Sequence, residues 1–161
     1  MRNRPSYPEV YLRMALIFAE RSHDGETRHA CILTDPEYRI ISCGTNGNPR
    51  GCDDDLLPDK RPTNEEEAKD PLKNKYFWKI HSEQNAIYNC AIKPPHGSKA
   101  FVTGTCCNNC AFALWQFGIT DIYMLDAHGT HLFDEVQKDI FNIFVEQTGI
   151  RIHKIKLDEI Y

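Results

Sequence analysis

Two stretches of the sequence decide the fold: IHSEQNAIYNC at residues 80–90 and GTCCNNCAFALWQFGI at residues 104–119. Both begin with polar residues and continue with apolar residues at helical spacing, so we expect helices over 81–92 and 107–117. Gly118 closes the second helix, because glycine is favoured just after a last turn. The rest of the fold is built around these two helices.

Hydrophobic periodicity and turn residues give the remaining elements. We expect further helices over 8–21 and 132–147, and strands over 29–35, 39–44, 99–104, 119–125 and 150–157. The turn sequence DPEY joins the first two strands into a hairpin. Strands that then alternate with helices predict an α/β fold, a single domain over 1–161 with one central sheet.

Two helices carry apolar stripes that we expect to face inward. In the helix over 8–21 the stripe is Val10, Met14, Ile17 and Phe18. In the helix over 132–147 it is Leu132, Val136, Ile140, Ile143 and Phe144.

The composition of the 161 residues, 41% hydrophobic and 26% charged, is typical of a soluble globular domain. No apolar run is long enough to span a membrane, and the stretch MRNRPSYPEV lacks the apolar segment of a secretory signal. We therefore expect a cytoplasmic protein without a membrane partner. The formal net charge of −4 argues against a nucleic-acid partner.

Seven cysteines are present, an odd number, and a reducing cytosol disfavours disulfides. We expect Cys31, Cys43 and Cys90 to be buried free thiols. The polar segment over 45–75 is rich in glycine, proline and acidic residues. A loop of this length is usually functional or disordered; we expect a functional first half and a solvated second half.

Histidine nitrogen and thiolate sulfur are the ligands that zinc prefers. Cys107 and Cys110 are three residues apart at a helix start, where free N–H groups favour thiolate, and His81 starts the other helix. Three protein ligands leave one position open, which is the mark of a catalytic zinc site. Glu83, two residues after His81, is placed to act as the proton carrier.

Each of these residues also has a simpler interpretation. A lone C-x-x-C pair can be a redox pair or half of a closed zinc site, and an acid at a helix start can simply compensate the helix dipole. Redox chemistry would leave His81 and Glu83 unexplained, and a closed four-cysteine site needs a second C-x-x-C pair, which the sequence lacks. The combination therefore favours a zinc enzyme.

Three stretches resemble the motifs of deoxycytidylate (dCMP) deaminases: IHSEQNAIYN, CCNNCAFALWQFGI and GTNGNPRGCDDDLLP. The resemblance runs in order from about residue 10 to residue 125, and it includes the H-x-E and C-x-x-C pattern of zinc deaminases. It implies a three-layer α/β/α fold around a mixed five-stranded sheet. It also implies Zn²⁺-dependent hydrolysis of dCMP to dUMP and ammonia for thymidylate synthesis. Regulated relatives form hexamers and respond to dCTP, with Mg²⁺, as activator and to dTTP as inhibitor.

The resemblance assigns zinc binding to His81, Cys107 and Cys110 and proton transfer to Glu83. It places Asn46 at the deoxyribose or base. The expected effector-site residues are Arg50, Gly51, Cys52, Asp53, Asp54 and Asn85. For the phosphate and the rest of the substrate the candidates are Arg21, Ser22, Arg28 and Thr105, and Arg50 is an alternative phosphate ligand.

The sequence departs from the family motifs at several positions. Cys106 replaces a proline that would suit the first helical turn, Ser82 replaces an alanine, and Asn48 replaces an aromatic residue. A base-stacking tyrosine is replaced by His128 or His131. The exact base and phosphate number therefore stay open: dCTP or a modified deoxycytidine nucleotide are alternatives to dCMP. A tRNA adenosine deaminase, a nucleoside deaminase and a non-catalytic nucleotide-binding domain are the rival functions.

Overall fold

A computed structural model describes residues 4–126 and 134–157 of the chain. Five strands form one sheet in the order β2-β1-β3-β4-β5. The strands are β1 (Ala30–Thr34), β2 (Ile40–Thr45), β3 (Ser98–Val102), β4 (Ile119–Leu125) and β5 (Arg151–Ile155). The β1–β2 and β1–β3 pairs are antiparallel, and β3, β4 and β5 run parallel. The predicted hairpin and mixed five-stranded sheet are confirmed.

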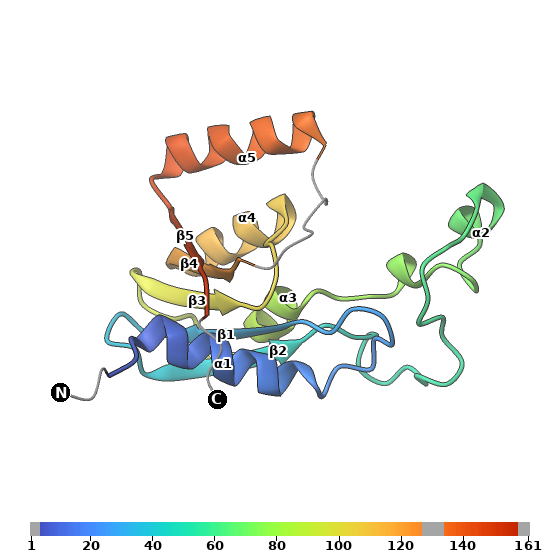
Figure 1. Ribbon diagram of the computed structural model, residues 1–161, viewed down its shortest axis with the longest axis horizontal. Helices are drawn as coiled ribbons and strands as arrows, with labels where there is room; N and C mark the ends of the chain where they lie inside the picture. Colours follow the sequence, from blue (N-terminus) through green and yellow to red (C-terminus); the bar gives the residue numbers. More distant parts are fainter. Residues whose placement is uncertain (1–3, 127–133, 158–161) are drawn as a thin grey trace.

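Helices cover both faces of the sheet (Figure 1). They are α1 (Tyr7–Ala19), α2 (Glu65–Lys69), α3 (Ser82–Tyr88), α4 (Asn108–Phe117) and α5 (Glu135–Thr148), with a 3-10 turn at Lys75–Phe77. Helix α1 packs on one face, and α3 and α4 pack on the other. The alternation along β1 shows why: Ala30 and Ile32 join the core beneath α1, whereas Cys31 and Leu33 join the core beneath α3 and α4.

The inward face predicted for α1 was largely wrong, although Phe18 packs against the core as predicted. The buried residues are Tyr11, Leu12, Ala15 and Ala19, whereas Met14 is 40% exposed and Ile17 is 69% exposed. The two alanines lie on the face that packs against the sheet. Helical spacing alone did not identify this face, because the alanines were not counted as apolar positions.

The inward face predicted for α5 was also largely wrong. This helix has no fully buried residue, and Val136, Ile140 and Ile143 are exposed. It packs beside α4 through the Phe112 and Phe144 rings, whose centroids lie 4.7 Å apart. Leu132 falls outside the described residues. Its half-buried residues Phe141, Phe144 and Val145 pack against the core cluster under α4, so the contact face of α5 is narrower than predicted and is displaced from Val136, Ile140 and Ile143.

Segment 46–80 leaves the sheet after β2 and returns to it at the start of α3, with α2 at its far end (Figure 1). Helix α2 has no buried residue, in line with the solvated second half that the sequence predicted. The return is fixed by two backbone hydrogen bonds between Gly47 and Ile80, with N–O distances of 2.8 and 3.1 Å. The segment is therefore anchored beside the starts of α3 and α4.

Helix α3 is shorter than expected, since it ends at Tyr88 and not at residue 92. It lies very close to β2. A Cβ atom built on Gly44 would come within 2.3 Å of the Ala86 nitrogen and within 2.6 Å of the Ser82 carbonyl oxygen. The Ser42 hydroxyl donates to the Ala86 carbonyl at 2.6 Å, and this hydrogen bond also holds β2 against α3.

We predict that Gly44→Ala lowers the free energy of unfolding by about 2 kcal/mol or more, because the added methyl group forces α3 away from the sheet. Chemical denaturation measures this change. Gly47→Ala is the matched control, since nothing lies within 4 Å of its Cβ position. Equal stability of the two variants would contradict the close-packing argument.

Candidate metal centre and its cavity

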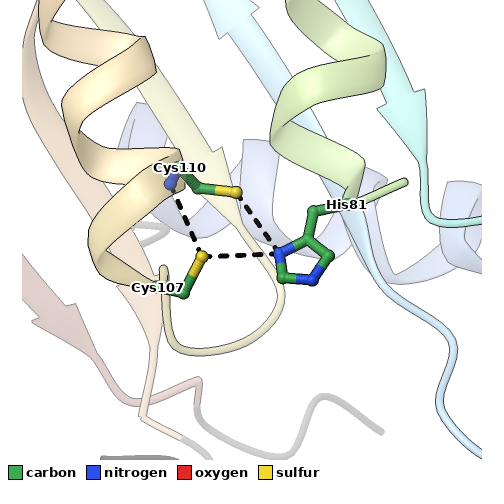
Figure 2. A group of neighbouring side chains, drawn as sticks. All are labelled: His81, Cys107 and Cys110. Carbon is green, nitrogen blue, oxygen red and sulfur yellow. Dashed lines mark hydrogen bonds between the residues drawn. The ribbon is translucent and has the colours of Figure 1, made fainter. Parts of the chain in front are cut away.

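His81, Cys107 and Cys110 meet between the starts of α3 and α4, and their ligand atoms lie within 4.8 Å of one another (Figure 2). The His81 Nδ1 atom lies 3.5 Å from the Cys107 sulfur and 3.3 Å from the Cys110 sulfur. Cys107 is the N-cap of α4, and its sulfur accepts the Cys110 backbone N–H at 3.5 Å. The two helix starts thus bring together one nitrogen and two sulfur donors.

These distances fit a tetrahedral zinc ion. Zinc–sulfur bonds of about 2.3 Å and zinc–nitrogen bonds of about 2.0 Å at a tetrahedral angle place a sulfur and a nitrogen ligand about 3.5 Å apart. The two observed nitrogen–sulfur distances, 3.5 and 3.3 Å, are close to this value. The donor set fits zinc both by its chemistry and by its spacing.

The ionisation of the two cysteines also suits metal binding. A hydrogen bond from Cys110, together with His81, lowers the pKa of Cys107 to about 4. The pKa of Cys110 is raised, because its thiol is hydrogen-bonded to Cys107 and because the site is buried. One thiolate is therefore ready at neutral pH, and binding a metal releases the proton of the second thiol.

Glu83 lies in the first turn of α3, and only 4% of its surface is exposed. Burial raises its pKa above the ordinary value, although hydrogen bonds, including one from Ser82, oppose this shift. The Ser82 hydroxyl donates to the Glu83 carboxylate at 2.9 Å. A buried carboxyl with a raised pKa is suited to accept and return a proton.

Cys106 does not belong to the group of three donors. It is fully buried, and burial raises its pKa well above the ordinary value. It lies one residue before the N-cap of α4 and not in the first turn, where the sequence analysis had placed it. Its backbone N–H donates to the Met124 sulfur at 3.2 Å, a contact that a proline at this position could not make.

A cavity of about 560 Å³ opens beside the donors, and it is lined by His81, Glu83, Cys107 and Thr105. Asn46 lies on its wall, but the Asn46 carboxamide is already engaged. Its oxygen accepts from the Ser22 hydroxyl at 2.7 Å and from the His29 N–H at 2.8 Å, and its nitrogen donates to the Thr27 carbonyl at 2.8 Å. Asn46 thus holds the chain before β1 against the cavity, and its binding role stays a prediction.

The arginines expected at the phosphate are not on this cavity. Arg28 is exposed and is not part of the lining, and Arg21 lines a second cavity. Three cations of segment 46–80 line the main cavity in their place, namely Arg61, Lys75 and Lys79. The sequence analysis missed them. The two lysines stand within six residues of His81, and this proximity was the available signal.

Lys75 is paired inside the protein. Its ammonium lies 2.7 and 2.9 Å from the two carboxylate oxygens of Asp24 and 3.3 Å from Glu26. The Lys75 and Asp24 side chains are 2% and 3% exposed. Burial works to raise the pKa of Asp24, but hydrogen bonds from Lys75 and from the Thr27 and Glu26 N–H groups outweigh it, so the pKa lies below its ordinary value.

The second cavity, of about 470 Å³, lies on the other side of the loop after β2. Three of the expected effector residues line it: Arg50, Asp54 and Asn85. Gly51, Cys52 and Asp53 are exposed and do not line it. The Asn85 carboxamide donates to the Thr45 carbonyl at 2.8 Å, which ties α3 to the end of β2.

Comparison with known proteins agrees with this site. The family model of the cytidine and deoxycytidylate deaminase zinc-binding region matches residues 5–126. The chain belongs to this family. It is 35% identical over 123 residues to mouse deoxycytidylate deaminase, with 76% of this chain and 66% of the mouse protein covered. It is 32% identical over 119 residues to a probable deoxycytidylate deaminase of Drosophila melanogaster, with 74% of this chain and 59% of that protein covered.

Family membership also agrees with the solved structures. The chain superimposes on dCMP deaminase from the cyanophage S-TIM5 with a TM-score of 0.64 at 20% identity, covering 95% of this chain and all of that one. The same phage protein is known in complex with dCMP and dUMP. The likeness confirms the predicted three-layer fold. The expected stacking residues His128 and His131 lie outside the described residues. Within the described part of the chain, no helix has the length and apolar character needed to cross a membrane.

We predict that Lys75→Met lowers the free energy of unfolding by about 3–5 kcal/mol, because it leaves the Asp24 carboxylate buried without its partner. Urea denaturation measures the change. Lys73→Met is the matched control: Lys73 lies 4.0 Å from Asp70, but its side chain is 53% exposed, so its removal should cost less than about 0.5 kcal/mol. Similar losses in both variants would contradict the burial argument.

Proposed function

We propose that this chain is a zinc-dependent hydrolase that converts dCMP and water to dUMP and ammonia. The observation that carries the proposal is the position of Glu83, a buried carboxyl with a raised pKa on the same cavity as the donors of His81, Cys107 and Cys110. A zinc site with a purely structural role does not need such a group. The names of the curated relatives support dCMP as the substrate.

In this proposal His81, Cys107 and Cys110 hold the zinc ion. Zinc, when bound, lowers the pKa of water so that a nucleophile is available at neutral pH. Glu83 accepts a proton from the water that attacks C4 of the cytosine ring and delivers a proton to the departing amino group, so that ammonia leaves. Ser82 holds the Glu83 carboxylate through the 2.9 Å hydrogen bond.

Substrate binding falls to the remaining lining of the cavity. Thr105 is on the wall beside Cys107, and Asn46 orders the opposite wall through its bonds to Ser22, His29 and Thr27. The Lys75–Asp24 pair holds the returning arm of segment 46–80 against this wall. These residues orient the nucleotide and limit the entry of water.

We also propose that the second cavity is the site at which dCTP, with Mg²⁺, and dTTP act. It gathers the cations Arg21 and Arg50 beside the Asn85 amide and the Asp54 carboxylate, groups that suit a nucleotide phosphate and a Mg²⁺ ion bound with it. The exposed apolar residues Val136, Ile140 and Ile143 of α5 are consistent with a homo-oligomer such as a hexamer. A cytoplasmic role in supplying dUMP for thymidylate synthesis follows from this activity.

The test is ammonia release by the zinc-loaded protein from dCMP, dCTP, CMP and deoxycytidine, each with and without dCTP/Mg²⁺ or dTTP. We predict turnover of dCMP above the other three, with a rise on adding dCTP and a fall on adding dTTP. Turnover of dCTP at the rate of dCMP would instead indicate a broader nucleotide deaminase. A protein that binds zinc and turns over none of the four would contradict the proposal.

Glu83→Gln tests the proton-carrier role within the same assay. The glutamine keeps the size and the hydrogen-bonding capacity of the side chain but cannot accept and return a proton, so we predict a loss of about 100-fold or more in kcat. Zinc content and the unfolding midpoint should match those of the unaltered protein. Normal turnover by this variant would show that another group moves the proton.

A further inference from the structure

The three cations on the main cavity differ in what neutralises them. Lys75 is surrounded by the carboxylates of Asp24 and Glu26. Arg61 lies 3.5 Å from Glu26 and donates to the Thr27 hydroxyl at 2.7 Å. Both charges are therefore offset by acids of the protein itself.

Lys79 is different. Its ammonium donates to the side-chain oxygen of Asn48 at 2.9 Å, and over residues 4–126 and 134–157 no carboxylate lies within ion-pair distance of it. A carboxamide is neutral and takes one of the three ammonium protons. Two donors and a full positive charge remain for an anion in the cavity.

Asn48 is held in the orientation that this contact needs. Its side-chain nitrogen donates to the Asp54 carboxylate at 2.7 Å, so its oxygen must face Lys79. Asp54 in turn lies 3.2 Å from His23. The Asn48 carboxamide thus lies between the Lys79 ammonium and the Asp54 carboxylate. It keeps Asp54 from forming an ion pair with Lys79.

The backbone fixes the same arrangement. Lys79 precedes Ile80, which is bonded in both directions to Gly47, the residue before Asn48. Lys79 also lies two residues before His81, so its position is tied to that of the metal donors. Asn48 is neutral, so it can hold Lys79 without cancelling its charge.

We propose that Lys79 is the residue that binds the phosphate of the nucleotide, and that Asn48 positions Lys79 for this role. The inference rests on the proposed function, because it assigns the phosphate of the proposed substrate to Lys79. A phosphate presents several anionic oxygens to the two free ammonium protons. A nucleoside lacks this group and gains nothing from Lys79.

The test compares dCMP with deoxycytidine in three variants. Lys79→Met removes the charge, and Asn48→Leu keeps the lysine but removes the carboxamide that orients it. Both should lower kcat/KM for dCMP by about 10- to 100-fold, mainly through KM, while kcat/KM for deoxycytidine changes by less than about twofold. Lys154→Met, an exposed lysine of β5, is the control and should leave both substrates unchanged.

A binding measurement separates this inference from the proposed function. Calorimetric titration of the unaltered protein should give tighter binding of dUMP than of deoxyuridine, and Lys79→Met should remove most of that difference. This result can hold even if the protein turns over no substrate. The inference is overturned if dUMP binds no better than deoxyuridine, if Lys79→Met affects nucleotide and nucleoside equally or affects neither, or if Arg61→Met alone removes the preference.

Discussion

The close contact between α3 and β2 at Gly44 is the constraint on which the site depends. Because Gly44 has no side chain, the backbone of α3 lies directly on the strand. Helix α3 then starts beside α4 on the same face of the sheet, and His81 meets Cys107 and Cys110. A wider spacing between α3 and β2 would move the His81 nitrogen away from the sulfurs of Cys107 and Cys110, which lie at the start of α4.

Two carboxylates are buried on the wall of the main cavity, and each is held by a polar partner. Glu83 is held by Ser82, and Asp24 is held by Lys75. Burying such groups costs free energy that only good hydrogen bonding offsets. Their position beside the metal-type donors agrees with an active site.

Much of the fold and of the metal centre could be predicted from the sequence, because the signals are local. The histidine, the acid and the cysteine pair each stand at a helix start, and Gly118 and Gly149 end helices with φ of 111° and 71°. The faces of α1 and α5 could not be predicted, because which residues of a helix are buried depends on the element it meets. Small alanines face the sheet in α1, and α5 packs through Phe141, Phe144 and Val145.

The cations on the main cavity were missed for a related reason. Arg21 and Arg28 lie near the first strand in the sequence, whereas Lys79 reaches the cavity at the end of a long segment that returns beside Gly47. Only the folded chain shows that Lys75 is ion-paired with Asp24, whereas Lys79 has no ion pair among the residues that the structure describes. Asn48 departs from the family motif, and only the folded chain shows that its side chain contacts both Lys79 and Asp54.

Zinc X-ray absorption spectroscopy of the purified protein tests the central claim most directly, because it reports the number and type of atoms around the metal. The account predicts one zinc ion per chain with two sulfur ligands at about 2.3 Å and nitrogen or oxygen ligands at about 2.0 Å. The same spectrum should be obtained from Cys106→Ala, since Cys106 is not a ligand. Absence of zinc, or a shell of three or four sulfurs, would contradict the site built from His81, Cys107 and Cys110.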